Sequence, residues 1–213
     1  MIYAVEFEGF FVKKSFVFKE ICVRSVEDNI TLIHFFIRSP YPFERLTRKE
    51  RGIVKYCEEN LHGIFWYAGH NQFKEVRHFI QETITSDDVV YTKGNQKVDI
   101  LKRQLGLACS VIDIEAERPE AYKSLAEKHP GEEEQCCPLS FHRDSVHCAV
   151  FKTLLLKNIL KEVEESSFEN TISENEQVPK EKCTVLETDN EMSWTETESS
   201  HSISNHGPDT GSE

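Results

Sequence analysis

The charged and aromatic residues of this chain are divided unevenly between two segments, and the division limits what each segment can fold into. Residues 1–161 hold 23 Lys+Arg and 23 Asp+Glu, together with 13 of the 14 Phe residues. Residues 162–213 hold 2 Lys, 14 Asp+Glu and 15 Ser+Thr, so they carry the whole net charge of −12. Such a segment cannot bury enough apolar surface to offset the entropy lost on ordering. The sequence therefore predicts one folded domain over residues 1–161 and a disordered acidic tail over residues 162–213.

The cysteines and the first residues indicate a compartment. The chain has no apolar run of about 18 residues, the length of a membrane span, and MIYAVEFEGF lacks the basic and apolar regions of a secretory leader. We therefore expect a cytoplasmic or nuclear protein whose seven cysteines are reduced thiols or metal ligands. Cys22, Cys57 and Cys109 stand among apolar residues and are expected in the core.

Three segments at the start of the chain have the composition of β-strands. Residues 2–11 are rich in β-branched and aromatic residues. Residues 11–26 are interpreted either as one long strand or as two strands with a turn near Lys13 and Lys14. Residues 30–38 form an apolar run that ends at a Ser-Pro pair. Together these segments predict an antiparallel meander.

Helical and strand patterns alternate along the rest of the domain. Thr47 and Glu50 fit a capping box before a helix that ends near residue 62. Further helices are predicted over residues 71–84, 98–105, 119–128 and 144–164, and further strands over residues 63–69, 88–94 and 109–115. A meander followed by alternating helices and strands is the ribonuclease-H-like topology, with helices on both faces of a mixed sheet. The predicted fold class is therefore α/β and ribonuclease-H-like.

Two acids of the first predicted strand, Glu6 and Glu8, are the most informative polar residues of the domain. Strand alternation places both side chains on one face. Two carboxylates on an otherwise apolar strand are costly unless they bind a cation or hydrogen-bond donors, and nucleases use such pairs to hold divalent metal beside a phosphate. The alternative is an edge strand with one face in water.

Segments at opposite ends of the domain resemble motifs of the DEDD exonucleases. EFE (residues 6–8) lies on the first strand, where that family has Asp-x-Glu. HCAVFK (residues 147–152) lies on the last helix, where the family has His-x-Ala-x-x-Asp. AGHNQFKEVRHFI (residues 68–80) is similar to the middle motif of the family. The resemblance covers residues 1–161 and implies an exonuclease-like fold.

Two positions of this resemblance carry lysine where the family has a metal-holding acid. Lys152 stands at the last Asp of the helix motif, and Lys74 stands at the acid of the middle motif. A lysine at a metal site repels Mg²⁺, and Lys152 is expected to pair with Glu6 or Glu8. Because two-metal cleavage of phosphodiesters needs a nearly complete acidic set, the resemblance implies a degenerate site, of which Glu6, Glu8 and His147 are remnants.

Cysteine and histidine cluster in CCPLSFHRDSVHC (residues 136–148). This cluster resembles the zinc ligands of the Maelstrom domain, an exonuclease-like fold of the germline piRNA pathway that lacks the catalytic acids and holds zinc with a Glu, two Cys and a His. The resemblance implies a structural zinc ion held by Glu8, Cys137, His142 and Cys148, a donor set that suits tetrahedral zinc. The alternative is a loop with incidental Cys and His. Which of the two adjacent cysteines faces the metal is left open.

The strings HGIFWYAG (residues 62–69) and VVYTKGNQK (residues 89–97) are similar to a wider group of such domains found beside animal mobile elements. Within that group, a short degenerate nuclease domain with an acidic tail looks most like a piRNA-pathway protein of the fly. This resemblance implies a role in germline small-RNA silencing.

Trp194 is isolated in the acidic segment DNEMSWTETESS (residues 189–200) and has no core to join. Tryptophan is a frequent hot-spot residue at interfaces, and Argonaute-family proteins take up such residues in surface pockets. The resemblance thus implies a Piwi-type Argonaute partner; the alternative is an accidental tryptophan. A neutral domain and a tail of charge −12 predict weak or no binding of nucleic acid.

Three functions are compatible with these patterns. The first is a non-catalytic adaptor in germline transposon silencing, located in the cytoplasm or in perinuclear germline granules (nuage). The second is a metal-dependent exonuclease on RNA or DNA, in which Glu6 and Glu8 hold the ion and His147 is the general base. The third is a zinc-stabilised nucleic-acid module.

Overall fold

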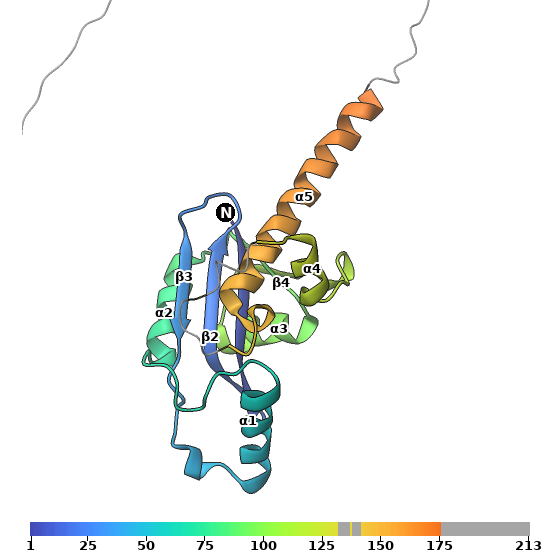
Figure 1. The fold of residues 1–213 in the computed structure, drawn as a ribbon. Helices are drawn as coiled ribbons and strands as arrows, with labels where there is room; N and C mark the ends of the chain where they lie inside the picture. Colours follow the sequence, from blue (N-terminus) through green and yellow to red (C-terminus); the bar gives the residue numbers. More distant parts are fainter. Residues whose placement is uncertain (132–136, 138–141, 176–213) are drawn as a thin grey trace, which may run out of the picture. The chain divides into compact units, whose positions relative to one another are not determined.

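Five strands form one mixed sheet in the computed structural model of the chain (Figure 1). The structure describes residues 1–131, 137 and 142–175. The strand order is β3-β2-β1-β4-β5, so the first strand of the chain is the central one. The strands are β1 (Ile2–Val12), β2 (Ser15–Ser25), β3 (Leu32–Phe36), β4 (Val89–Thr92) and β5 (Ser110–Asp113).

The strand directions define the fold class. β1 pairs antiparallel with β2, and β2 pairs antiparallel with β3, as the meander predicts. On its other side β1 is parallel to β4, and β4 is parallel to β5. Parallel neighbours need crossover connections, which the helices between β3, β4 and β5 supply. This order and these directions are those of the ribonuclease-H-like sheet, so the predicted fold class is confirmed.

The turn between β1 and β2 resolves the alternative left open by the sequence. Lys13 and Lys14 both have positive φ, 51° and 61°. A two-residue loop with two positive φ angles matches the twist of antiparallel strands. Residues 11–26 are therefore the end of one strand, a tight turn and a second strand.

The helices are α1 (Arg48–Asn60), α2 (Phe73–Thr83), α3 (Asn95–Ile100), α4 (Tyr122–Lys128) and α5 (Ala149–Asn175), and α3 continues into a π-helical turn at Leu101–Leu105. The capping box of α1 is confirmed. The Thr47 hydroxyl accepts from the backbone N–H of Glu50 at 3.3 Å, and the Glu50 carboxylate accepts from the N–H of Thr47 at 2.8 Å.

Apolar side chains are buried on both faces of the sheet. The face with α2 and α3 buries Phe7, Ile80 and Leu101. The opposite face buries Cys22 and Phe151 beneath α5, which packs on β1 and β2 (Figure 1). A third cluster around Trp66 joins the end of β1 to α1. The three cysteines expected in the core, Cys22, Cys57 and Cys109, are buried.

Residues 63–69 are a loop, and the strand predicted there is wrong. Trp66 is buried while Tyr67 is 66% exposed, which mimics strand alternation. The backbone is bound by side chains instead of by a neighbouring strand: Trp66 N–H donates to Glu58 at 2.6 Å, and the Lys19 ammonium donates to Trp66 O at 2.9 Å. At Gly69, with φ of 88°, a Cβ would lie 2.5 Å from the carbonyl of Ile37.

The last helix begins and ends later than the sequence predicts. Its first residue is Ala149 rather than residue 144, because Ser145–His147 form a separate 3₁₀ turn. It ends at Asn175, so it continues beyond residue 161, where the sequence places the start of the tail. Residues 1–175 form one compact unit, and residues 176–213 lie outside the described part. Among the described residues, no helix combines the length and apolarity needed to cross a membrane.

Candidate functional site

Glu6 and Glu8 lie on the central strand, on the face covered by α5. The structure therefore contradicts the edge-strand alternative. Neighbouring residues Val5 and Phe7 pack into the opposite core, whereas Ala4 lies in the cluster beneath α5. The side chain of Glu6 is fully buried, and that of Glu8 is 16% exposed. Two buried carboxylates on one face need strong donors or cations, and each has them.

Glu6 is held by the end of β4 and the start of α3. Its carboxylate accepts from the Thr92 hydroxyl at 3.2 Å and from the Lys93 N–H at 3.0 Å. It also forms an ion pair with the ammonium of Lys97. Because β4 is the parallel neighbour of β1, its carboxyl end brings these donors beside Glu6. Lys97 thus supplies the positive charge that the buried Glu6 carboxylate needs.

Glu8 is held by α5. Its carboxylate forms an ion pair with Lys152, whose side chain is only 9% exposed. Burial alone would raise the pKa of Glu8, but Lys152 and Lys97 hold it below the ordinary value. Burial alone would lower the pKa of Lys152, but Glu8 and Glu6 hold it above the ordinary value. Both partners are therefore charged at neutral pH, as the sequence predicts for Lys152.

An aromatic ring lies against both lysines. The ammonium groups of Lys152 and Lys97 lie 5.2 and 5.9 Å from the centroid of the Tyr122 ring. Burial and then the neighbouring Glu6 carboxylate raise the pKa of Tyr122 well above its ordinary value. The acid pair is thus enclosed by two cations and a neutral phenol.

The other expected members of a nuclease site are elsewhere. Lys74 is exposed at the start of α2, whereas the ion pairs of Glu6 and Glu8 come from α3 and α5. His147 is partly exposed and pairs with Asp144, and the general-base role expected for it stays a prediction. Lys97 is the last residue of the string VVYTKGNQK, but the sequence gives no sign that it pairs with Glu6, which is distant in the chain.

A second cluster lies beneath the start of α5 and fits a metal ion. Glu20, Cys137, His142 and Cys148 each offer one ligand atom, and these atoms all lie within 4.8 Å of one another. Three of the four predicted ligands are thus brought together. Glu8 is not the fourth, and Glu20 takes its place.

The correction from Glu8 to Glu20 follows from the register of the first hairpin. Glu8 and Glu20 are directly paired across β1 and β2, so both side chains point to the α5 face. Lys152 engages Glu8, which leaves Glu20 for the cysteines. Sequence reasoning missed Glu20 because the motif names one acid, and only the register shows that a second lies beside it.

Both carboxylate oxygens of Glu20 have hydrogen-bond partners. Oε1 lies 3.2 Å from Nε2 of His142 and 2.8 Å from Nε2 of His34. Oε2 accepts from the first N–H of α5, that of Ala149, at 3.1 Å. Burial alone would raise the pKa of Glu20, but its hydrogen bonds with His142 and His34 lower it to about 2. The carboxylate is ionised, the form that binds metal.

Cys148 is also in its metal-binding form. A hydrogen bond from Cys137 lowers the pKa of the Cys148 thiol to about 4, with a further contribution from His142. Burial alone would lower the pKa of His142, but its bonds with Cys148 and Glu20 raise it to about 10, so His142 has to release a proton when metal binds. Its other ring nitrogen, Nδ1, lies 3.3 Å from the carbonyl of His62, the orientation usual for a metal-bound imidazole.

These four residues fit zinc. Two thiolate sulfurs, one imidazole nitrogen and one carboxylate oxygen are donors that zinc binds in tetrahedral array. Ligand bonds of about 2.0–2.3 Å place such atoms roughly 3–4 Å apart, and the four atoms found here all lie within 4.8 Å of one another. Of the two adjacent cysteines, Cys137 faces the cluster; Cys136 and Trp194 lie outside the described residues.

Comparison with known proteins finds similarity in structure and none in sequence family. No protein-family model matches the chain, and no curated protein matches it. Among solved structures, the chain is similar to "Exonuclease X in complex with 5' overhanging duplex DNA" at 16% identity and a TM-score of 0.45, over 76% of this chain and 92% of that one. The ribonuclease-H-like assignment stands on the order and direction of the five strands.

Proposed function

We propose that this chain is a non-catalytic ribonuclease-H-like adaptor, in which the former nuclease centre is closed by lysines. The observation that carries the proposal is the pair of buried ion pairs, Lys97 with Glu6 and Lys152 with Glu8. Two-metal catalysis needs acids that are free to hold divalent ions. Here the acids already hold two internal cations.

Admitting a metal ion would be costly. Glu8 would have to give up Lys152 and leave an unpaired ammonium in the interior, which typically costs about 3–5 kcal/mol. Mg²⁺ also retains several water molecules around itself, whereas the Glu6 carboxylate is fully buried and bonded to protein donors. The two lysines therefore favour the closed state over metal binding.

The Glu20, Cys137, His142 and Cys148 cluster supports a structural role for zinc in this adaptor. A closed set of four protein ligands is typical of structural zinc sites, whereas catalytic sites keep one position open. The cluster connects β2 with the segment before α5 and with the start of α5 itself. Bound zinc would fix the helix that presses Lys152 onto Glu8.

The biological setting is proposed from the sequence resemblance. Domains of the Maelstrom kind act in germline small-RNA silencing, and the Glu-Cys-His-Cys cluster now matches their zinc ligands in residue types. We assign this chain to transposon silencing in the cytoplasm or in perinuclear germline granules. Its partner is a Piwi-type Argonaute, and Trp194 is the anchor residue.

Nuclease digestion tests the non-catalytic part of the proposal. The full chain is incubated with single-stranded RNA and DNA in the presence of Mn²⁺ or Mg²⁺. No cleavage above that of a mock purification is expected, since both acids are paired. Metal-dependent cleavage that disappears in Glu8→Gln would establish the alternative, a metal-dependent exonuclease, and would refute the proposal.

A binding measurement tests the partner. Trp194→Ala is expected to weaken the affinity for a germline Piwi-type Argonaute by more than tenfold, as for an interface hot spot. Met192→Ala, in the same acidic segment, is the matched control and should change the affinity little. Equal affinities of the wild type and Trp194→Ala, measured by biolayer interferometry, would remove this residue from the account.

A further inference from the structure

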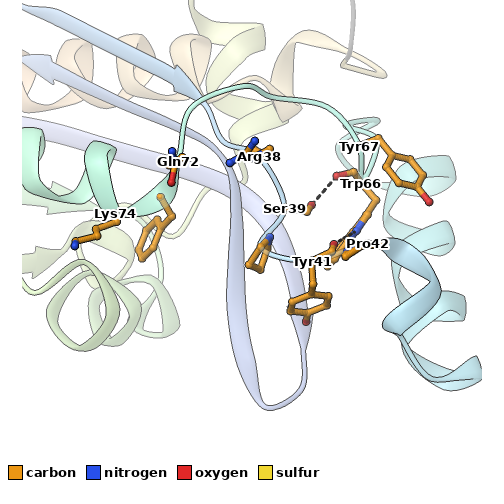
Figure 2. A pocket seen from close by; sticks show the side chains of 10 residues that line it. Arg38, Ser39, Tyr41, Pro42, Trp66, Tyr67, Gln72 and Lys74 are labelled. Carbon is orange, nitrogen blue, oxygen red and sulfur yellow. Dashed lines mark hydrogen bonds between the residues drawn. The ribbon is translucent and has the colours of Figure 1, made fainter.

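A groove unrelated to either acid cluster lies where β3 leads into the loop before α1 (Figure 2). A pocket of about 610 Å³ lies between Arg38, Tyr41, Tyr67 and Lys74. A smaller pocket of about 270 Å³ adjoins it and shares the lining residues Arg38, Pro40, Tyr41 and Phe73. We propose that this groove binds an acidic peptide that carries one large apolar side chain.

The charge of the groove carries the first part of the argument. Lys13, Arg38 and Lys74 line the two pockets, and none of the described lining residues is an acid. Arg38 and Lys74 are exposed, and Figure 2 labels both among the residues that line the larger pocket. In a domain whose basic and acidic residues balance, an acid-free groove of this size selects an anionic ligand.

A further positive charge lies below the pocket. The ammonium of Lys19 is buried, and its hydrogen-bond partners are the neutral oxygens of Ser39, Trp66 and Ala68. Burial lowers the pKa of Lys19 to about 8, so it still carries its charge at neutral pH. No carboxylate hydrogen-bonds it within the described part of the chain, and the charge of Glu58 is the one that partly offsets the effect of burial on its pKa.

The same lysine makes the groove rigid. Lys19 ties the chain at Ser39 to the loop at Trp66, and the Ser39 hydroxyl donates to Trp66 O at 2.6 Å (Figure 2). The indole N–H of Trp66 donates to the carbonyl of Tyr41 at 3.0 Å. Both walls are thus cross-linked by hydrogen bonds before any ligand arrives, which lowers the entropy lost on binding.

The smaller pocket is suited to an apolar side chain of the ligand. Its walls include Val12, Phe16, Phe18, Ile37 and Phe73. The polar lining residues are Lys13, Ser15, Arg38 and Gln104. A pocket with this mainly apolar lining is suited to bury an apolar side chain. The combination of this pocket with a cationic rim matches a peptide of acidic residues around one large apolar residue.

Single-stranded nucleic acid fits less well, because the rings of Tyr41 and Phe73 already contact other side chains, which leaves Tyr67 as the exposed ring of the groove. Bases bind by stacking on free aromatic faces. Lys13 lies 4.0 Å over the Tyr41 ring, with Trp66 packed beside it. Phe73 is stacked on Phe18 with their centroids 5.0 Å apart. The anion is therefore a carboxylate-rich peptide, and nucleic acid is an outcome for the experiment to exclude.

Fluorescence anisotropy with the full chain tests this proposal. The probes are fluorescein-labelled peptides of glutamate and serine around one central phenylalanine, leucine or tryptophan. At least one peptide is expected to bind. Its affinity should fall at least tenfold when the central residue is alanine, when the glutamates are glutamines, or when the protein carries Arg38→Gln and Lys74→Gln.

The matched control protein carries Lys102→Gln and Lys123→Gln, which remove the same charge from exposed positions that line neither pocket. Its affinity should remain that of the wild type. Absence of binding by the wild type, or equal affinities of the two double variants, would overturn the proposal. Displacement of the peptide by oligouridylate at lower concentration would assign the groove to nucleic acid instead. Neither outcome bears on Trp194 or on the closed nuclease centre.

Discussion

Lys152 and Glu8 are both largely buried, so neither can lose its partner without leaving a charge in the protein interior. The energetic consequence is asymmetric. Removing one member of a buried pair is far more costly than replacing both by apolar residues of similar size. The same asymmetry holds for Lys97 and Glu6, where Glu6 is fully buried. This explains why lysine is favoured at both positions as long as Glu6 and Glu8 are present.

Lys152→Met is expected to lower the free energy of unfolding by about 3–5 kcal/mol, because Glu8 remains buried and unpaired. The double variant Glu8→Leu with Lys152→Met should be clearly more stable than that single variant. Urea denaturation of the full chain measures both. Lys128→Met is the control, since its pair with Glu120 is largely exposed and should contribute less than about 1 kcal/mol. A double variant less stable than the single one would contradict the account.

At the level of single residues, the sequence predicts the functional residues that belong to a recognisable motif. Glu6, Glu8 and Lys152 fall within motifs, and the structure pairs Lys152 with Glu8 as one of the two expected partners. Glu20 lies in no motif, and the string that ends at Lys97 names no role for that lysine. The roles of both residues depend on strand pairing between separate segments of the chain. His147 matches a motif but pairs with Asp144, which is its neighbour in the 3₁₀ turn before α5.

At the scale of elements, the β1–β2 turn sets the register on which both acid clusters depend. Lys13 and Lys14 adopt positive φ without being glycine or asparagine, and such a conformation costs roughly 1–2 kcal/mol per residue. The register that results places Glu8 opposite Glu20. A bulge follows at Gly9, where a Cβ would lie 2.1 Å from the carbonyl oxygen of Val17.

Lys14→Gly is expected to raise the free energy of unfolding by about 1 kcal/mol, because glycine adopts positive φ without the steric cost. Thermal denaturation followed by circular dichroism measures the change. Lys55→Gly, at an exposed position inside α1, should instead destabilise the protein by about 1 kcal/mol. Destabilisation by both substitutions would mean that the turn is not strained.

The elements that the sequence predicts correctly are those with a local cause. The capping box starts α1, and the apolar runs of β1, β2 and β3 form the meander. The strand predicted over residues 63–69 is wrong because an apolar loop held by side chains has the same alternation of buried and exposed residues as a strand. Lys19, which binds this loop, is distant from it in sequence. The predicted end of α5 is wrong because the composition indicated a tail, whereas the helix continues to Asn175.

At the scale of the whole molecule, the two acid clusters lie under one helix and have opposite roles. α5 supplies Lys152 to close the nuclease centre, and its first turn supplies the N–H of Ala149 and the preceding Cys148 to the zinc cluster. In the proposed function, α5 therefore exchanges one metal site for another, because it closes the acid pair and helps to form the zinc cluster. The adaptor function proposed here depends on this exchange.

The metal content of the full chain tests this exchange most directly. The protein is dialysed against Zn²⁺ and Mn²⁺ together, then against buffer alone, and analysed by inductively coupled plasma mass spectrometry beside Glu8→Gln. The account predicts about one zinc ion per chain, as for a closed four-ligand site, and no retained manganese in either protein. Manganese retained by the wild type and lost in Glu8→Gln, or a wild type without zinc, would contradict it.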